Sequence, residues 1–433
     1  MMAIPNTGST LRERNAAPIH GALLYILVFQ NLFNAFSPYL TLAINIIAVI
    51  SLLIQHRLRY VAPVPVVIAG VYVVLAWMLL VTIYRGGDAE TQIFLKYFRV
   101  TVTVSLFALI FGNCPIPALS LVKAINFALG FHVLLVMLQI AFPDLTNTTA
   151  PVFGFEREIT ILEEYSLRKL GASSSYDTAA LLSVAALLFF HLQFAQGKGS
   201  LYLLMAAVAF VAALMSSRTG MALSVLIVSV LSLRAILRAP LIWKLVASLC
   251  IAGLMVSAYF LIYPLLLHTL GISELQPDEA SLVFAAADYG STGTLDALTE
   301  DHLKPLDQPL SDLLIGFAVD PNTIARYTDI GYVKLIYHVG IVGTLVILFV
   351  HLYMLVGTRR FMRASEHDCD RQMIARFLFV FIAIGLAFNY KSLELHSRGT
   401  GDFIYMLFLF LASRRGLRDR LGNPSHTRAP SHS

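Results

Sequence analysis

Long uncharged runs of apolar residues recur along this chain and constrain what it can fold into. The clearest pair flanks Arg218, because no Lys, Arg, Asp or Glu occurs in residues 200–217 or 219–233. A membrane-crossing helix needs about 20 mostly apolar residues. Twelve runs approach that requirement, at residues 20–36, 39–55, 63–84, 94–112, 120–142, 178–195, 200–216, 219–234, 241–266, 331–356, 374–390 and 402–413.

The composition is typical of an integral membrane protein. It is 58% hydrophobic and 13% charged, with a mean hydropathy of +0.74, whereas soluble domains are about 25% charged. In lipid a spanning segment has to satisfy its own backbone polar groups, so the runs predict α-helices. We therefore expect an all-α polytopic membrane protein of about 12 transmembrane helices, with residues 1–433 forming one integral membrane domain.

The distribution of charge predicts the orientation. With the N-terminus inside, twelve spans return the C-terminus inside. The inside segments and the inner ends of the adjoining runs then hold 19 of the 31 Lys and Arg residues but only 5 of the 26 acids. An excess of Lys and Arg marks cytoplasmic segments. Both termini are thus predicted to be cytoplasmic, and the basic pI follows from topology, so no nucleic-acid partner is needed.

Two connections are long, and both are predicted to lie outside. They are residues 142–177 and residues 268–330. Long connections are uncommon unless they are functional or disordered, and both mix aromatic, aliphatic and charged residues. We expect partly helical caps over the outer face, with a short amphipathic helix at residues 273–288.

Three polar stretches connect an outside loop to the start of a helix. They are residues 167–182, 216–224 and 313–346. Helix N-termini favour anions through their free N–H groups and their dipole. Arg168 and Arg218 add a full positive charge to the first two, and the third contains Arg326 and Lys334. Guanidinium groups suit phosphate and carboxylate, and a membrane enzyme acting on a lipid diphosphate at the outer leaflet would need such a cluster. Pairing with a neighbouring carboxylate or snorkelling to headgroups explains any single arginine equally well.

Together these stretches resemble the O-antigen polymerase and ligase superfamily of bacterial inner-membrane glycosyltransferases. The matching motifs are Arg168-Lys-Leu-Gly171, Ser217-Arg218-Thr219-Gly220, and Gly316-Phe317 followed by Asp329-x-x-Tyr332 and Gly340-x-x-Gly343. Ligases of the superfamily usually have a histidine, often in a His-Asn pair, where this chain has Asp329. That difference favours the polymerase (Wzy-type) branch. The paired Arg-x10-Gly segments described for the polymerases are not found here.

The resemblance implies a reaction and a set of roles. Undecaprenyl-diphosphate-linked oligosaccharide units would be polymerised into a surface polysaccharide, lipopolysaccharide O-antigen or another exopolysaccharide, at the periplasmic face of the inner membrane. A chain-length regulator and a flippase are the candidate protein partners, and no cofactor or metal is expected. The residues assigned are Asp329 and then Asp320 as the catalytic base, Arg218, Arg168, Arg326 and Lys334 for the diphosphate, and Tyr332, Tyr327, Phe317 and Tyr289 for sugar.

Other features favour structural explanations. Asp368 and Asp370 form an Asp-x-Asp pair, which soluble glycosyltransferases use for metal, but here they precede a helix, where capping is the expected role. His132 and His191 are expected to be packing residues.

The rival functions are an O-antigen ligase, a flippase or transporter of lipid-linked oligosaccharide, and a non-catalytic assembly factor. A transporter would place ionisable residues at mid-membrane, and the predicted spans are nearly free of them.

Overall fold

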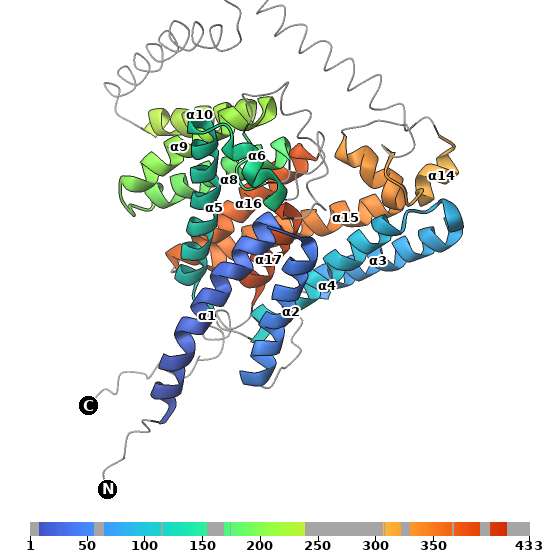
Figure 1. The fold of residues 1–433 in the computed structure, drawn as a ribbon, viewed down its shortest axis with the longest axis horizontal. Coiled ribbons are helices and arrows are strands. Elements are labelled where there is room, and N and C mark those ends of the chain that lie inside the picture. Colours follow the sequence, from blue (N-terminus) through green and yellow to red (C-terminus); the bar gives the residue numbers. More distant parts are fainter. Residues whose placement is uncertain are drawn as a thin grey trace, which may run out of the picture. The chain divides into compact units, whose positions relative to one another are not determined.

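The computed structural model describes residues 8–55, 65–113, 116–153, 169–173, 175–238, 306, 308–321, 330–365, 368–389 and 399–413, and over these residues its regular structure is entirely helical (Figure 1). This confirms the all-α class. The predicted amphipathic helix at residues 273–288 lies outside the described residues.

Helices occupy eleven of the twelve predicted apolar runs, and the twelfth, residues 241–266, lies outside the described residues. In the described part, six helices are long and apolar enough to cross a membrane: α3, α4, α5, α8, α15 and α16. The helices are α1 (Gly8–Phe33), α2 (Pro38–Gln55), α3 (Pro65–Arg85), η1 (Gly86–Asp88), α4 (Thr91–Asn113), α5 (Ala118–Ala141), α6 (Leu145–Thr149), η2 (Ala150–Phe153), α8 (Tyr176–Ala195), α9 (Leu201–Ser216), α10 (Arg218–Arg238), α14 (Leu310–Ile315), α15 (Gly331–Ala364), α16 (Cys369–Phe388) and α17 (Thr400–Ala412).

The chain divides into two compact units. One comprises Met1–Met221 and Pro305–Ser433, and the other comprises Ala222–Lys304. The described part of the second unit is the portion of α10 from Ala222 to Arg238. All packing discussed below belongs to the first unit.

Exposed apolar side chains indicate a protein embedded in lipid. On α2, Ile46, Ile47, Ile50, Leu53 and Ile54 are all exposed, Ile54 to 81%. These residues recur at the three- and four-residue spacing that makes one face of a helix. A soluble protein would bury such a face, so the stripe is explained by contact with hydrocarbon.

α8 is one of the interior helices of the first unit. Every residue from 179 to 190 is buried, which is expected of a helix that is apolar all round. α8 packs on α9, α5 and α16. A second group of helices, α3, α4 and α15, shares a core that includes Met78, Tyr97 and Leu335.

A break at Gly340 divides α15. Gly340 has φ 68° and ψ 178°, which removes local carbonyls from the helical ladder. The carbonyl of Tyr337 instead accepts from the N–H groups of Phe317 (2.8 Å) and Ala318 (3.1 Å). That of Val339 accepts from Trp77 Nε1 at 2.8 Å. Neighbouring elements thus supply the hydrogen-bond donors that these two carbonyls need and that lipid does not provide.

The Asp-x-Asp pair has the structural role expected of it. Asp368 caps α16 by accepting a hydrogen bond from the Arg371 N–H at 3.0 Å. Asp370 forms an ion pair with Lys198. Arg371 donates to the carbonyls of Leu411 and Ser413 at the end of α17, where a cation is favoured by the helix dipole.

The break in α15 predicts that residue 340 has to be glycine. An added Cβ would lie 2.3 Å from the Leu314 carbonyl oxygen, and an L-residue at this positive φ costs about 1–3 kcal/mol before any clash. Gly340→Ala should therefore lower the apparent midpoint of thermal unfolding in detergent.

Gly130→Ala in α5 is the matched control. Its nearest neighbour would be Met205 Cε at 3.7 Å, an ordinary contact, and alanine is the better helix former. The control should leave the midpoint unchanged or raise it. A Gly340→Ala protein as stable as this control would contradict the assigned role of the break.

Candidate functional site

Two of the three predicted polar stretches meet at one end of the first unit. The N–H of Lys169 donates to the Met215 carbonyl at 2.9 Å. This bond joins the residue after Arg168 to the last turn of α9, three residues before Arg218. Arg168 itself lies outside the described residues, and so does the side chain of Arg218. We call residues 169–173 the basic-motif loop and residues 216–220 the Ser-Arg turn.

Side chains of α5 hold the basic-motif loop in place. Gln139 Oε1 accepts from the N–H groups of Leu170 (3.1 Å) and Gly171 (2.8 Å). His132 Nδ1 accepts from the N–H of Ala172 at 3.1 Å. Three consecutive backbone donors are therefore satisfied by two buried side chains.

Gly171 is required by this arrangement. It has φ +56°, and an added Cβ would lie 2.6 Å from His132 Cε1 and Val136 Cγ2. At the glycine of the Arg168-Lys-Leu-Gly171 motif, the loop backbone thus passes too close to α5 to leave room for a side chain.

His132 is a neutral structural residue, as expected. Because Nδ1 accepts a hydrogen bond, the ring proton lies on Nε2. Nε2 is 3.2 Å from the Ala179 carbonyl and 3.0 Å from Ser183 Oγ, and both can accept. Both ring nitrogens are satisfied, and no cluster of His, Cys, Asp and Glu suited to a metal occurs in the described part of the chain.

Two helix N-termini lie side by side next to the loop. Ser175 Oγ accepts from the Thr178 N–H and caps α8, and Ser217 Oγ accepts from the Gly220 N–H at the start of α10, each at 3.1 Å. An added Cβ at Gly220 would lie 2.5 Å from Ala180 Cβ, so the first turns of α8 and α10 are in close contact. Their positive dipole ends therefore add over a small region.

Lys169 points its side chain into the protein. The residue is only 6% exposed, and burial lowers the pKa of its ammonium group below the usual value. An inward lysine leaves the neighbouring arginines as the candidates for an external anion.

A cavity of about 80 Å³ adjoins the basic-motif loop. Its walls come from the turn between α1 and α2, from Phe153, and from the loop and the start of α8. Its polar lining residues are Asn34, Ser37, Ser173 and Thr178. The side-chain oxygen of Asn34, Oδ1, is buried and has no hydrogen-bond partner among the described residues.

The third polar stretch is held by α3 and α4. Arg85, the last residue of α3, pairs with Asp312 at 2.8 Å and donates through Nε to the Gly316 carbonyl at 2.9 Å. The N–H of Asp320 donates to Glu90 Oε1 at 3.3 Å. These bonds fix residues 312–320 against the connection between α3 and α4.

The structure places four of the predicted site residues of this stretch. Phe317 stacks on Tyr337 (4.8 Å between ring centroids) and lies beneath the Arg85 guanidinium at 4.7 Å, so its ring is used in packing. Tyr332 donates its hydroxyl to the Leu386 carbonyl at 2.5 Å. Lys334, in the first turn of α15, and Asp320 are half-buried. Asp329, Arg326, Tyr327 and Tyr289 lie outside the described residues.

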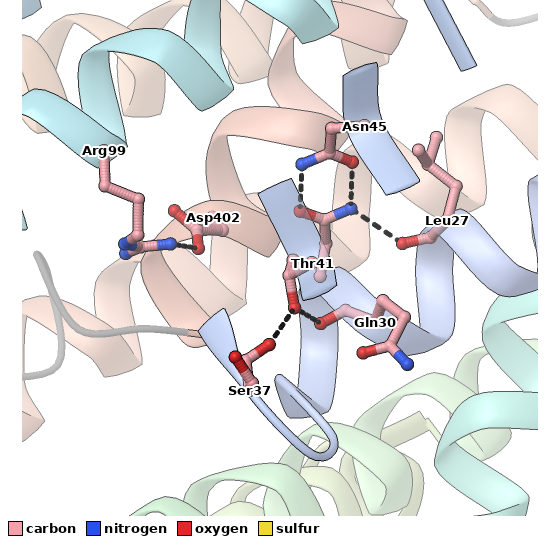
Figure 2. Close-up of polar contacts among 8 residues, drawn as sticks. Leu27, Gln30, Ser37, Thr41, Asn45, Arg99 and Asp402 are labelled. Atoms are coloured by element: carbon pink, nitrogen blue, oxygen red, sulfur yellow. Dashed lines mark hydrogen bonds and ion pairs between the residues drawn. The ribbon is translucent and has the colours of Figure 1, made fainter. Parts of the chain in front are cut away.

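Sequence reasoning missed a buried ion pair. Arg99 of α4 and Asp402 of α17 lie 2.5 Å apart, and they are 9% and 0% exposed (Figure 2). The same close-up labels Asn45 of α2, whose amide exchanges two hydrogen bonds with the amide of Asn31 in α1. The expectation of nearly charge-free spans is corrected here: Arg99 lies well inside α4, and its partner is 303 residues away in sequence.

Neither a protein-family model nor a curated protein sequence matches this chain. Functional inference therefore depends on the site itself.

Loss of the Gln139 amide should loosen the basic-motif loop. In Gln139→Leu two buried N–H groups lose their acceptor, at about 1–3 kcal/mol each. Trypsin can cut after the buried Lys169 only when the loop opens. The two losses together amount to about 2 kcal/mol or more, so we expect cleavage there to rise about 30-fold or more, measured by mass mapping of limited digests.

Gln193→Leu is the control. Gln193 exchanges hydrogen bonds with Asn126, also between α5 and α8, but near the other end of α8. Its removal should leave cleavage after Lys169 unchanged. Equal cleavage in wild type and Gln139→Leu would show that α5 does not hold the loop.

Proposed function

We propose that the protein is a membrane glycosyltransferase that polymerises undecaprenyl-diphosphate-linked oligosaccharide units at the periplasmic face of the bacterial inner membrane. The observation that carries the proposal is the hydrogen bond between Lys169 and Met215. It brings together the two arginine-bearing stretches that resemble motifs of the O-antigen polymerase and ligase superfamily, which the sequence separates by about fifty residues.

The chemistry favours a diphosphate at this place. Arg168 directly precedes the basic-motif loop in the sequence, and Arg218 is the first residue of α10, whose first turn contacts that of α8. We propose that their two guanidinium groups act together at this point. Guanidinium forks and helix N-termini both bind phosphate oxygens. The leaving group of the proposed reaction is a diphosphate that is already activated, so positioning and charge stabilisation are the main requirements.

The remaining roles are assigned with the third stretch. Asp329, followed by Asp320, is proposed to accept the proton of the attacking sugar hydroxyl. Arg326 and Lys334 are second-rank diphosphate ligands. Sugar contacts are proposed for Tyr289, Tyr327 and the ring of Tyr332, whereas the packed ring of Phe317 is a weaker candidate.

One observation favours a second function. Buried ionisable groups inside spanning helices mark transport pathways in many membrane proteins, and Arg99–Asp402 is such a pair. A flippase for lipid-linked oligosaccharide is therefore the alternative. Ligase activity keeps the weaker support of the superfamily resemblance.

Deletion of the gene separates these functions. Loss of a polymerase leaves surface glycan with a single repeat unit, and loss of a ligase leaves full-length polymer on its lipid carrier. Loss of a flippase traps single units on the cytoplasmic leaflet. An unaltered surface glycan would reject all three.

Arg218 is the residue whose substitution tests the proposed site most directly. Arg218→Ala should abolish chain extension in the complemented deletion strain, read as the glycan ladder on a gel, with normal protein levels in the membrane. Arg218→Lys should retain only part of the activity, because a point charge does not reproduce the bidentate fork.

Lys123→Ala is the control for this pair. Lys123 is an exposed cation near the opposite end of α5. Its loss should leave the glycan ladder unchanged. A normal ladder from Arg218→Ala would overturn the assignment of the site.

A further inference from the structure

The guanidinium of Arg99 has one edge without a partner. Its Nη1 donates to Asp402 Oδ2 at 2.5 Å. Its Nε and Nη2 atoms are buried and have no hydrogen-bond partner among the described residues. These two nitrogens lie on the same side of the planar group, which is the side that grips ligands with two parallel N–H bonds.

Arg85 shows how the same edge is satisfied elsewhere in this protein. Its Nε donates to the Gly316 carbonyl at 2.9 Å and its Nη2 to Asp312 Oδ1 at 2.8 Å. Arg85 thus uses the Nε–Nη2 edge entirely on protein acceptors. Arg99 is less exposed than Arg85, so its unused edge carries a greater desolvation cost.

Asp402 has an acceptor atom that lacks a hydrogen-bond donor. Its Oδ1 atom is buried and accepts no hydrogen bond from the described residues. The residue is fully buried in the first turn of α17, where the helix dipole favours its negative charge. The ion pair therefore offers unused donors on Arg99 and an unused acceptor on Asp402.

The charge balance of the pair identifies the class of ligand. Arg99 and Asp402 cancel, so an added anion or cation would be a net charge in a buried place, which is costly. A hydroxyl group avoids this cost because it can accept from Arg99 and donate to Asp402 at once. Water and sugar both present such groups.

We infer that Arg99 and Asp402 form a buried binding site for hydroxyl groups, supplied by ordered water or by a sugar. The site is carried by α4 and α17, and the inference does not depend on the proposed glycosyltransferase activity. If the ligand is water, an ordered water molecule completes the hydrogen bonds of the ion pair between α4 and α17. With sugar, it is a specificity contact on two helices that carry none of the arginines assigned to the diphosphate.

Electron cryomicroscopy of the full-length protein in lipid nanodiscs, at a resolution that shows ordered water, tests this inference. Without sugar, we expect non-protein density within hydrogen-bonding distance of both the Arg99 Nε–Nη2 edge and Asp402 Oδ1. The same sample is then measured with glucose or N-acetylglucosamine at high concentration. Unchanged density identifies water, and replacement by ring-shaped density identifies a sugar site.

Arg99→Lys provides the matched variant. Lysine keeps the charge and the pairing with Asp402 but lacks the two-nitrogen edge, so the density should be lost while the ion pair persists. Arg85→Lys, the control, should leave density at Arg99 unchanged. The inference is overturned if the wild-type map shows no non-protein density at this place. It is also overturned if protein atoms bind the Arg99 Nε–Nη2 edge and Asp402 Oδ1. If the variant does not fold, the wild-type map alone decides.

Discussion

The hydrogen bonds from Gln139 and His132 to the backbone of residues 170–172 are the interaction on which the proposed site depends. They come from inside α5 and satisfy three consecutive N–H groups of the loop, which fixes the loop in place. Once the loop is fixed, Lys169 can bond to Met215, and the start of α10 can pack against the start of α8. The convergence of two arginine-bearing stretches thus follows from two side chains that carry no charge.

Buried polar groups at two other places in the protein obey the same rule, since a group hidden from water needs a partner. The break in α15 is satisfied by Trp77 and by the backbone of Phe317 and Ala318. Asn31 and Asn45 satisfy each other across α1 and α2. In the Arg99–Asp402 pair, two donor nitrogens and one acceptor oxygen lack hydrogen-bond partners among the described residues. A ligand is therefore inferred there and not at Arg85, whose Nε and Nη2 atoms both bind protein acceptors.

The sequence was sufficient to predict where the helices lie, because runs of apolar residues near membrane-spanning length have few other structures open to them. It also predicted the capping role of Asp368 and the packing role of His132, since both depend on local position or on the absence of a metal-binding pattern. The number of membrane crossings and the side of the membrane stay predictions.

What the sequence could not predict depends on contacts between distant residues. The glycines of the Gly340-x-x-Gly343 motif gave no sign that α15 breaks, because the break needs Trp77 and residues 317–318. No linear pattern pairs Arg99 with Asp402, because 303 residues separate them in sequence. The sequence also predicts a sugar-binding role for Phe317. It could not predict that this ring stacks on Tyr337, because the two residues are twenty positions apart.

The most direct test of the central claim uses purified protein in liposomes that contain a fluorescent undecaprenyl-diphosphate-linked oligosaccharide. Chain length and transbilayer movement of the lipid are followed in the same sample. A polymerase predicts a ladder of lengthening products from wild type and none from Arg218→Ala, with no accelerated movement of the lipid. Accelerated movement without any lengthening would contradict the account and establish transport as the function.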